Sequence, residues 1–172
     1  MSLMVMLVVV GQPAAKGVPL ANPAGDRHIW ADEMHPRPQW VKDIEAEFEN
    51  RQKQKALVKA LPLSRQIEFA AFQTVDWEPP DFEWAVWIGH ESGARVVPVL
   101  KVLLAKEPSD RFAAVLVEIA ALMVCERGAH IDDTDRRTLY EAAKRRVSKI
   151  RNPARRDRLK LDLEQLQTGR SE

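Results

Sequence analysis

The densest group of charged side chains lies between residues 144 and 160, where nine are basic and only Asp157 is acidic. The basic residues are Lys144, Arg145, Arg146, Lys149, Arg151, Arg155, Arg156, Arg158 and Lys160. Most are arginines, whose planar guanidinium binds a phosphate or a carboxylate through two parallel hydrogen bonds. The segment is therefore predicted to bind nucleic acid or an acidic protein partner. A helix face that contacts only water has the same composition, and no zinc finger or RNA-recognition signature accompanies it.

Three short segments resemble catalytic or phosphate-binding signatures, and each lacks a required residue. Lys16 precedes Gly17, whereas a phosphate-binding loop needs glycine, then lysine, then a hydroxyl. His90 and Glu91 begin a zinc-protease pattern, but Ala94 occupies the position of its second histidine. In the same stretch, Glu91 occupies the central position that a nucleophile elbow gives to serine. We therefore expect no catalytic site, and an enzyme would have to bring His90, Glu91 and His130 into one pocket.

Acidic and histidine side chains gather in a second region, and the sequence predicts no metal there. Its members are Glu126, His130, Asp132, Asp133 and Asp135. Calcium-binding loops place oxygen ligands at alternate positions around a glycine, a spacing that this region lacks. Aspartates at a helix start are already explained by capping and by the helix dipole. Because Cys125 is the only cysteine, multi-cysteine zinc and iron–sulfur sites are excluded, and we expect no cofactor.

Three tryptophans lie close together in the sequence, at Trp77, Trp84 and Trp87. Tryptophans of this kind are usually part of a hydrophobic core. If two of them were exposed on one face, they would instead indicate a binding surface. The sequence leaves both readings open, with the core reading favoured.

Length and composition are those of one folded domain. The chain has 172 residues, of which 45% are hydrophobic and 30% charged, too apolar for a disordered protein. Its net charge of +1 gives no overall attraction to nucleic acid or to anionic membranes, so such binding would need local clusters. A single cysteine fits a reducing compartment. We expect a cytoplasmic protein that does not enter the membrane.

The N-terminal region, residues 1–38, is predicted to differ from the rest. Met4 to Val10 is a run of apolar residues that predicts one buried strand, too short to span a bilayer. Residues 11–38 contain five prolines and three glycines, which predicts an irregular arm that packs on the body. The strand needs a partner, either within its chain or in a second subunit, and the second case would make the protein a homodimer.

Helical patterns begin after Pro38. Apolar residues at Trp40, Val41, Ile44 and Phe48 follow helical spacing, and this helix could continue as far as Leu61. Further helices are predicted over 64–73 and 96–104, the latter with a proline in its first turn. Residues 81–88 fit a short helix or a strand, with the helix favoured, and residues 89–93 are predicted to form a turn.

The C-terminal half gives the clearest boundaries. Residues 109–127 form a helix that is apolar on all sides, which indicates a central, buried position. A helix opening near Asp133 or Thr134 carries a stripe of apolar residues that ends at Ile150. Asn152 and Pro153 are an N-cap and a first helical residue, and Gly169 ends that last helix. The short joint predicts that these two helices pack antiparallel.

These patterns predict a mainly α fold, a compact bundle of about six or seven helices over residues 39–172 that forms one domain with the N-terminal arm. For function, they favour a non-catalytic interaction protein such as an adaptor, an assembly factor or a regulatory factor. The alternative is a nucleic-acid-binding protein that uses the basic segment 144–160.

Overall fold

The computed structural model describes residues 36–76, 81–125 and 131–169. The chain divides into two units, Met1–Asp32 and Glu33–Glu172. All described residues belong to the second unit. The predicted strand and most of the predicted arm lie outside the described residues, so the boundary at residue 38, the strand and the homodimer stay predictions.

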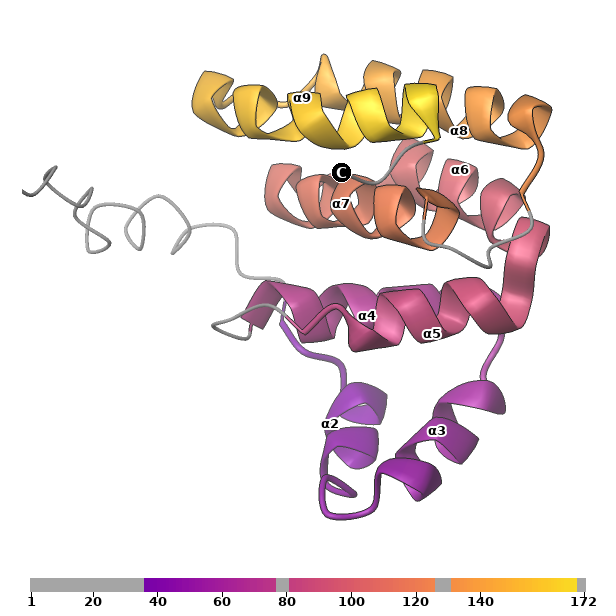
Figure 1. Cartoon of the computed structure of the whole chain (residues 1–172). Helices are drawn as coiled ribbons and strands as arrows, with labels where there is room; N and C mark the ends of the chain where they lie inside the picture. The colour runs from indigo at the N-terminus through magenta and orange to yellow at the C-terminus, as the bar shows by residue number, and fades with distance from the viewer. Residues whose placement is uncertain (1–35, 77–80, 126–130, 170–172) are drawn as a thin grey trace, which may run out of the picture. The chain divides into compact units, whose positions relative to one another are not determined.

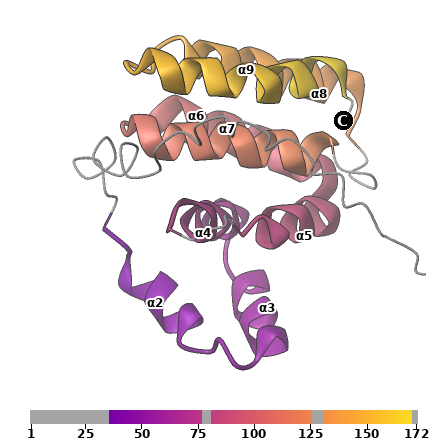
Figure 2. The same cartoon turned by 60° about the vertical axis from the view of Figure 1, so that its left-hand side comes forward.

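The described residues form a bundle of α-helices and contain no strand, which confirms the predicted fold class. In chain order the elements are α2 (Gln39–Glu45), α3 (Arg51–Lys59), α4 (Leu63–Asp76), α5 (Glu83–Ser92), the 3₁₀ turn η2 (Gly93–Arg95), α6 (Val96–Lys106), α7 (Asp110–Cys125), α8 (Asp133–Val147) and α9 (Pro153–Thr168). Figures 1 and 2 show α8 beside α9, then α6 beside α7, then α4 beside α5, with α2 and α3 beyond them.

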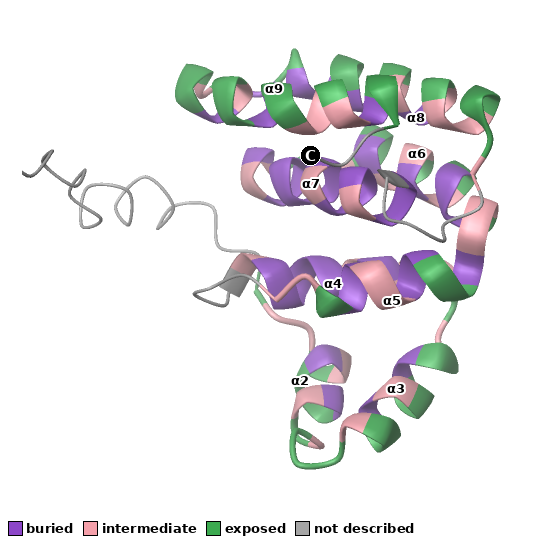
Figure 3. Ribbon diagram, in the orientation of Figure 1, coloured by how far each residue is buried: buried purple, intermediate pink, exposed green. Residues whose placement is uncertain are grey.

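Helix α7 is the centre of this bundle, as its composition predicts. It contacts α4, α5, α6, α8 and α9. From Phe112 to Val117 every residue is buried, and Figure 3 shows how little of the helix is exposed. The start of α7 is capped by Ser109, whose hydroxyl accepts a hydrogen bond from the Phe112 amide at 3.2 Å. A helix surrounded by five others has no face left for polar residues.

The helix predicted to follow Pro38 is divided into α2 and α3. Helix α2 ends at Glu45, and the side chain of Asn50 then accepts a hydrogen bond from the Lys53 amide at 2.9 Å, which caps a new helix. Val41 and Ile44 are buried as expected. The placement of Phe48 on the same buried stripe was wrong, because this residue lies in the turn between the helices and is 74% exposed.

Helix α5 confirms the helical reading of residues 81–88 and corrects the turn predicted at residues 89–93. Gly89 is helical, and a Cβ atom at this position would lie 3.0 Å from the Cα and carbonyl oxygen of Met123. Glycine is needed there because α5 and α7 approach closely. The helix ends at Gly93, whose φ of 53° lies in the left-handed region. Only the second glycine therefore belongs to a turn.

Helices α8 and α9 form the predicted antiparallel pair. The side chains of Asp132 and Asn152 cap the two helices, and Gly169, with φ of 70°, ends α9. Arg136, in the first turn of α8, donates hydrogen bonds to the carbonyl oxygens of Leu166, at 3.1 Å, and Gln167 in the last turn of α9. The start of one helix therefore lies beside the end of the other.

Candidate functional site

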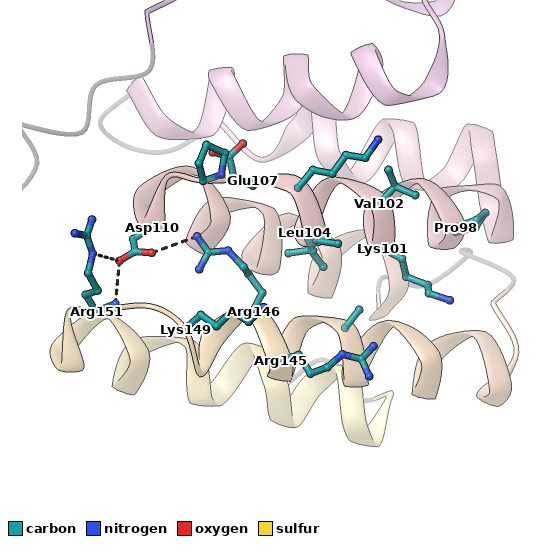
Figure 4. Close-up of a pocket in the computed structure, with 14 residues that line it drawn as sticks. Pro98, Lys101, Val102, Leu104, Glu107, Asp110, Arg145, Arg146, Lys149 and Arg151 are labelled. Carbon is teal, nitrogen blue, oxygen red and sulfur yellow. Dashed lines mark hydrogen bonds and ion pairs between the residues drawn. The ribbon is translucent and has the colours of Figure 1, made fainter.

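A groove of about 860 Å³ lies between α6 and α8, and part of the predicted basic segment borders it (Figure 4). This volume is in the range of ligand-binding clefts. We call it the basic groove. Its lining residues are Pro98, Lys101, Val102, Leu104, Ala105, Lys106, Glu107, Pro108, Asp110, Ala142, Arg145, Arg146, Lys149 and Arg151.

Helical spacing explains why these residues share one surface. On α8 the lining positions 142, 145 and 146 follow the i, i+3, i+4 pattern of one helix face, and Lys149 lies in the turn just after the helix ends at Val147. On α6 the positions 98, 101, 102 and 105 follow the same pattern. The end of α8 is held beside the start of α7, because Asp110, the first residue of α7, accepts a hydrogen bond from Arg146 in the last turn of α8. Two helical faces thus form the two walls of the groove.

One end of the groove is fixed by a network around Asp110, which Figure 4 shows between Arg146 and Arg151. Arg146 donates to the Asp110 carboxylate at 3.2 Å and to the Ser109 carbonyl at 3.1 Å. The Arg151 amide donates to the other Asp110 oxygen at 2.9 Å. Burial disfavours the charged carboxylate, but these hydrogen bonds outweigh it and hold the pKa of Asp110 below its usual value. Arg146 is therefore first a structural residue.

The remaining charge of the groove is positive. Its lining contains six basic residues and two acidic ones, Glu107 and Asp110. Both carboxylates are engaged within the protein, since Glu107 accepts a hydrogen bond from the Ser109 amide at 2.8 Å and Asp110 bonds as described above. Lys101 on α6, Arg145 on α8 and Lys149 in the turn after α8 supply cations along the walls. The groove therefore favours an anionic ligand.

Apolar side chains lie among these cations. Pro98, Val102, Ala105 and Ala142 line the groove, and Val102 is 49% exposed. An exposed β-branched residue offers apolar surface that a partner can cover. The groove therefore combines an apolar strip with basic borders.

The structure disperses the nine predicted basic residues. Four of them, Arg145, Arg146, Lys149 and Arg151, line the groove. Arg155 is buried, and Arg156 donates to the Ile150 carbonyl at 3.1 Å. None of the remaining five basic residues lines the groove.

Lys144 lies 5.5 Å from the centre of the Tyr140 ring, and Lys160 forms an ion pair with Asp157 at 2.8 Å. Arg158 is exposed on α9 and acts electrostatically on Glu118 of α7. Sequence reasoning missed Lys101 and Lys106, which are about 40 residues away from the segment in the chain. Their signal was that they are the only charged residues of the apolar helix α6.

A pair of carboxyl groups between α7 and α9 forms a second unusual feature. Burial, and then the carboxylate of Asp162, raise the pKa of Glu118 to about 7, although Arg158 and Arg155 partly oppose the change. Burial also raises the pKa of Asp162 to about 6. Neither residue lines the basic groove, and we assign the pair to the stability of the bundle.

The structure does not bring the histidine, glutamate and tryptophan candidates that it describes together in one site. His90 and Glu91 are exposed at the end of α5, and Glu91 forms an ion pair with Lys59 at 2.6 Å. His130 lies outside the described residues. Trp84 is buried and packs edge-to-face on Trp87, with ring centres 5.7 Å apart, so it belongs to the core. Trp77 also lies outside the described residues.

The aspartates of the acidic region after α7 take part in interactions at the start of α8. The Asp132 carboxylate accepts a hydrogen bond from the Asp135 amide at 2.8 Å, and Asp133 pairs with Arg136 at 2.6 Å. Among residues 36–76, 81–125 and 131–169, no three His, Cys, Asp or Glu side chains are placed to hold a metal ion. Glu126 lies outside these ranges, as does the side chain of Cys125.

Comparison with known proteins gives no relative. No protein-family model, no curated protein and no solved structure matches the chain. In the part of the chain that the structure describes, none of the helices has the length and apolar character needed to cross a bilayer. A functional proposal must therefore come from the basic groove itself.

Proposed function

We propose that the chain is a protein-interaction module whose basic groove receives an acidic segment of a partner protein. The observation that carries this proposal is the apolar strip around Val102 among the basic side chains that line the groove. A segment with apolar residues on one face and carboxylates beside them would match both features. Adaptors and assembly factors use such grooves to hold a helix of their partner.

The dimensions support a helical ligand. The α6 wall has 11 residues, and at a rise of about 1.5 Å per residue it extends for roughly 16 Å. This length accommodates about three turns of a helix laid along the groove. Carboxylates on the two flanks of that helix's apolar face would lie beside Lys101 on one wall and Arg145 or Lys149 on the other.

Nucleic acid is the less well supported ligand. Single-stranded nucleic acids are held by aromatic side chains on which bases stack, and the lining of the groove contains no aromatic residue. Two arginines of the basic segment, Arg146 and Arg155, are buried, which reduces the charge available to a phosphate backbone. The apolar strip would also remain uncovered by a phosphate chain.

The experiment compares three fluorescent probes by anisotropy across a salt series. The first is a synthetic helical peptide of glutamate and leucine, the second is polyglutamate of the same length, and the third is a DNA duplex. We expect the Glu–Leu peptide to bind most tightly, because it alone satisfies both the cations and the apolar strip. Tighter binding of the duplex, with an affinity that falls steeply with salt, would contradict the proposal and support nucleic-acid binding.

Matched variants locate the binding surface. The double substitution Arg145→Glu and Lys149→Glu should weaken the Glu–Leu peptide about tenfold or more, because attraction becomes repulsion at the same positions. Lys144→Glu is the control for each of the two single substitutions, since it reverses one charge on α8 outside the groove lining. Equal loss in the control would show that overall charge, not the groove, binds the peptide.

A further inference from the structure

The turn between α2 and α3 carries the most exposed large apolar side chain among the described residues. Residues 43–50, which we call the acidic tip, contain four carboxylates and no basic residue. Phe48 is 74% exposed, compared with 49% for Val102 in the groove. It stands between Glu47 and Glu49 in the sequence. An aromatic ring exposed between carboxylates is uncommon on a surface that contacts only water.

The tip is held in place by the helices around it. Gln54 donates from α3 to the Ile44 carbonyl of α2 at 3.1 Å, and Glu45 accepts a hydrogen bond from Gln73 of α4 at 2.6 Å. Glu47 accepts from Lys53 at 2.6 Å, an exposed pair that costs little to exchange for another cation. Phe48 is therefore presented on a braced turn and not on a loose loop.

The tip and the basic groove are complementary. The groove offers an apolar strip between cations, and the tip offers an apolar ring between carboxylates. Phe48 would cover Val102 and its neighbours, while Glu47 and Glu49 would face Lys101, Arg145 or Lys149. Figures 1 and 2 show that α4 and α5 separate α2 and α3 from the α6–α8 region, so the tip does not reach the groove of its own molecule.

We propose that the acidic tip of one copy of the chain binds the basic groove of a second copy. This inference rests on the proposed function of the groove and names its partner. The contact is head to tail, because each copy uses a different surface, and such contacts build rings or open chains and not closed pairs. One turn in one groove buries a small area, so the association is weak and depends on protein concentration.

The test is analytical ultracentrifugation of the full chain at concentrations from roughly 10 µM to 1 mM, a range suited to weak contacts. The wild-type protein should form species larger than a dimer as the concentration rises. A groove variant, Arg145→Glu with Lys149→Glu, and a tip variant, Phe48→Ser with Glu49→Lys, should each remain monomeric. Mixing the two variants should restore one species, a dimer, because each supplies the surface that the other lacks.

Controls make each outcome decisive. Lys144→Glu and Glu164→Lys change exposed charges elsewhere and should assemble like the wild type. Circular dichroism and thermal melting must show that each variant is folded. A wild-type monomer throughout the concentration range, or variants that do not dimerise when mixed, would overturn the inference.

Assembly that persists in both variants would also overturn it and would indicate another interface, such as the predicted strand at Met4 to Val10. Failure of this inference can be separated from failure of the proposed function. A monomeric wild type that still binds the Glu–Leu peptide, with loss of binding in the groove variant, keeps the groove as a binding site and removes only self-assembly. If the wild-type protein stays monomeric and also fails to bind the Glu–Leu peptide, both proposals are wrong.

Discussion

Glu118 of α7 is only partly exposed and lies near Asp162 of α9. Its pKa of about 7 is above the ordinary value of 4.5 because of burial and because of the nearby carboxylate of Asp162. The folded protein therefore binds a proton at this group more tightly than the unfolded chain does. Its favourable contribution to the free energy of unfolding is complete below pH 4.5 and is lost as the pH rises through 7.

The substitution Glu118→Gln tests this residue. Between pH 5 and pH 8 the wild-type protein should lose more stability than the variant, with a difference of about 1–3 kcal/mol, because glutamine does not ionise. Urea denaturation at the two pH values measures it. The matched control is Glu141→Gln, an exposed position on α8. An unchanged pH dependence in the Glu118 variant would show that this carboxyl is not the responsible group.

Single residues could be predicted where their role is local. Asn152, Pro153 and Gly169 were assigned from the sequence because capping and termination depend on neighbours a few positions away. Asp110 and Arg146 could not be paired in this way, since 36 residues separate them and either could have faced water. Phe48 was predicted to be buried because the helical spacing of apolar residues continues past the end of α2. The end of that helix becomes clear only from the Asn50 cap of α3.

At the scale of elements, Gly89 marks a close approach between the backbones of α5 and α7. A Cβ at Gly89 would lie 3.0 Å from the backbone of Met123, which cannot move without shifting the central helix. Gly89→Ala should therefore destabilise the protein by about 1–3 kcal/mol, although alanine is the better helix former. Thermal or urea denaturation measures the loss.

A neighbour on the same helix gives the control for this prediction. His90→Ala changes an exposed residue of α5 and should alter stability by less than about 0.5 kcal/mol. If Gly89→Ala were as stable as the wild type, α5 and α7 would have to separate more easily than their packing indicates. The sequence could not predict this contact, because a glycine in a helix interface and a glycine in a turn look alike until the partner helix is known.

At the scale of the whole molecule, burial is unevenly distributed among the helices. Helix α7 is buried from Phe112 to Val117, whereas α2 and α3 each have two buried residues. In hydrogen exchange, amides of α7 should therefore exchange at least about a hundredfold more slowly than those of α2 and α3, because the outer helices open without unfolding the core. Mass spectrometry of exchanged peptides measures this difference, and equal protection would contradict it.

The overall architecture could be predicted further than the site. An apolar helix flanked by amphipathic ones identifies a bundle and its centre, because burial follows composition. The basic groove needed two helices that are distant in the chain, and only the α8 wall had a local signal in Arg145 and Lys149. Lys101 could not be assigned to the groove from the sequence, because its position there depends on α6 packing beside α8. Of the nine clustered basic residues, only Arg145, Arg146, Lys149 and Arg151 line the groove, so the local charge count overstated how many of them share one surface.

The antiparallel pair of α8 and α9 is fastened at both ends. Arg136 ties the start of α8 to the end of α9, and Asp110 holds the joint between them through Arg146 and Arg151. The α8 wall of the groove is therefore preorganised, and it loses little conformational entropy when a ligand arrives. The cost of becoming ordered falls on the ligand, so segments that are already structured before they arrive have the advantage.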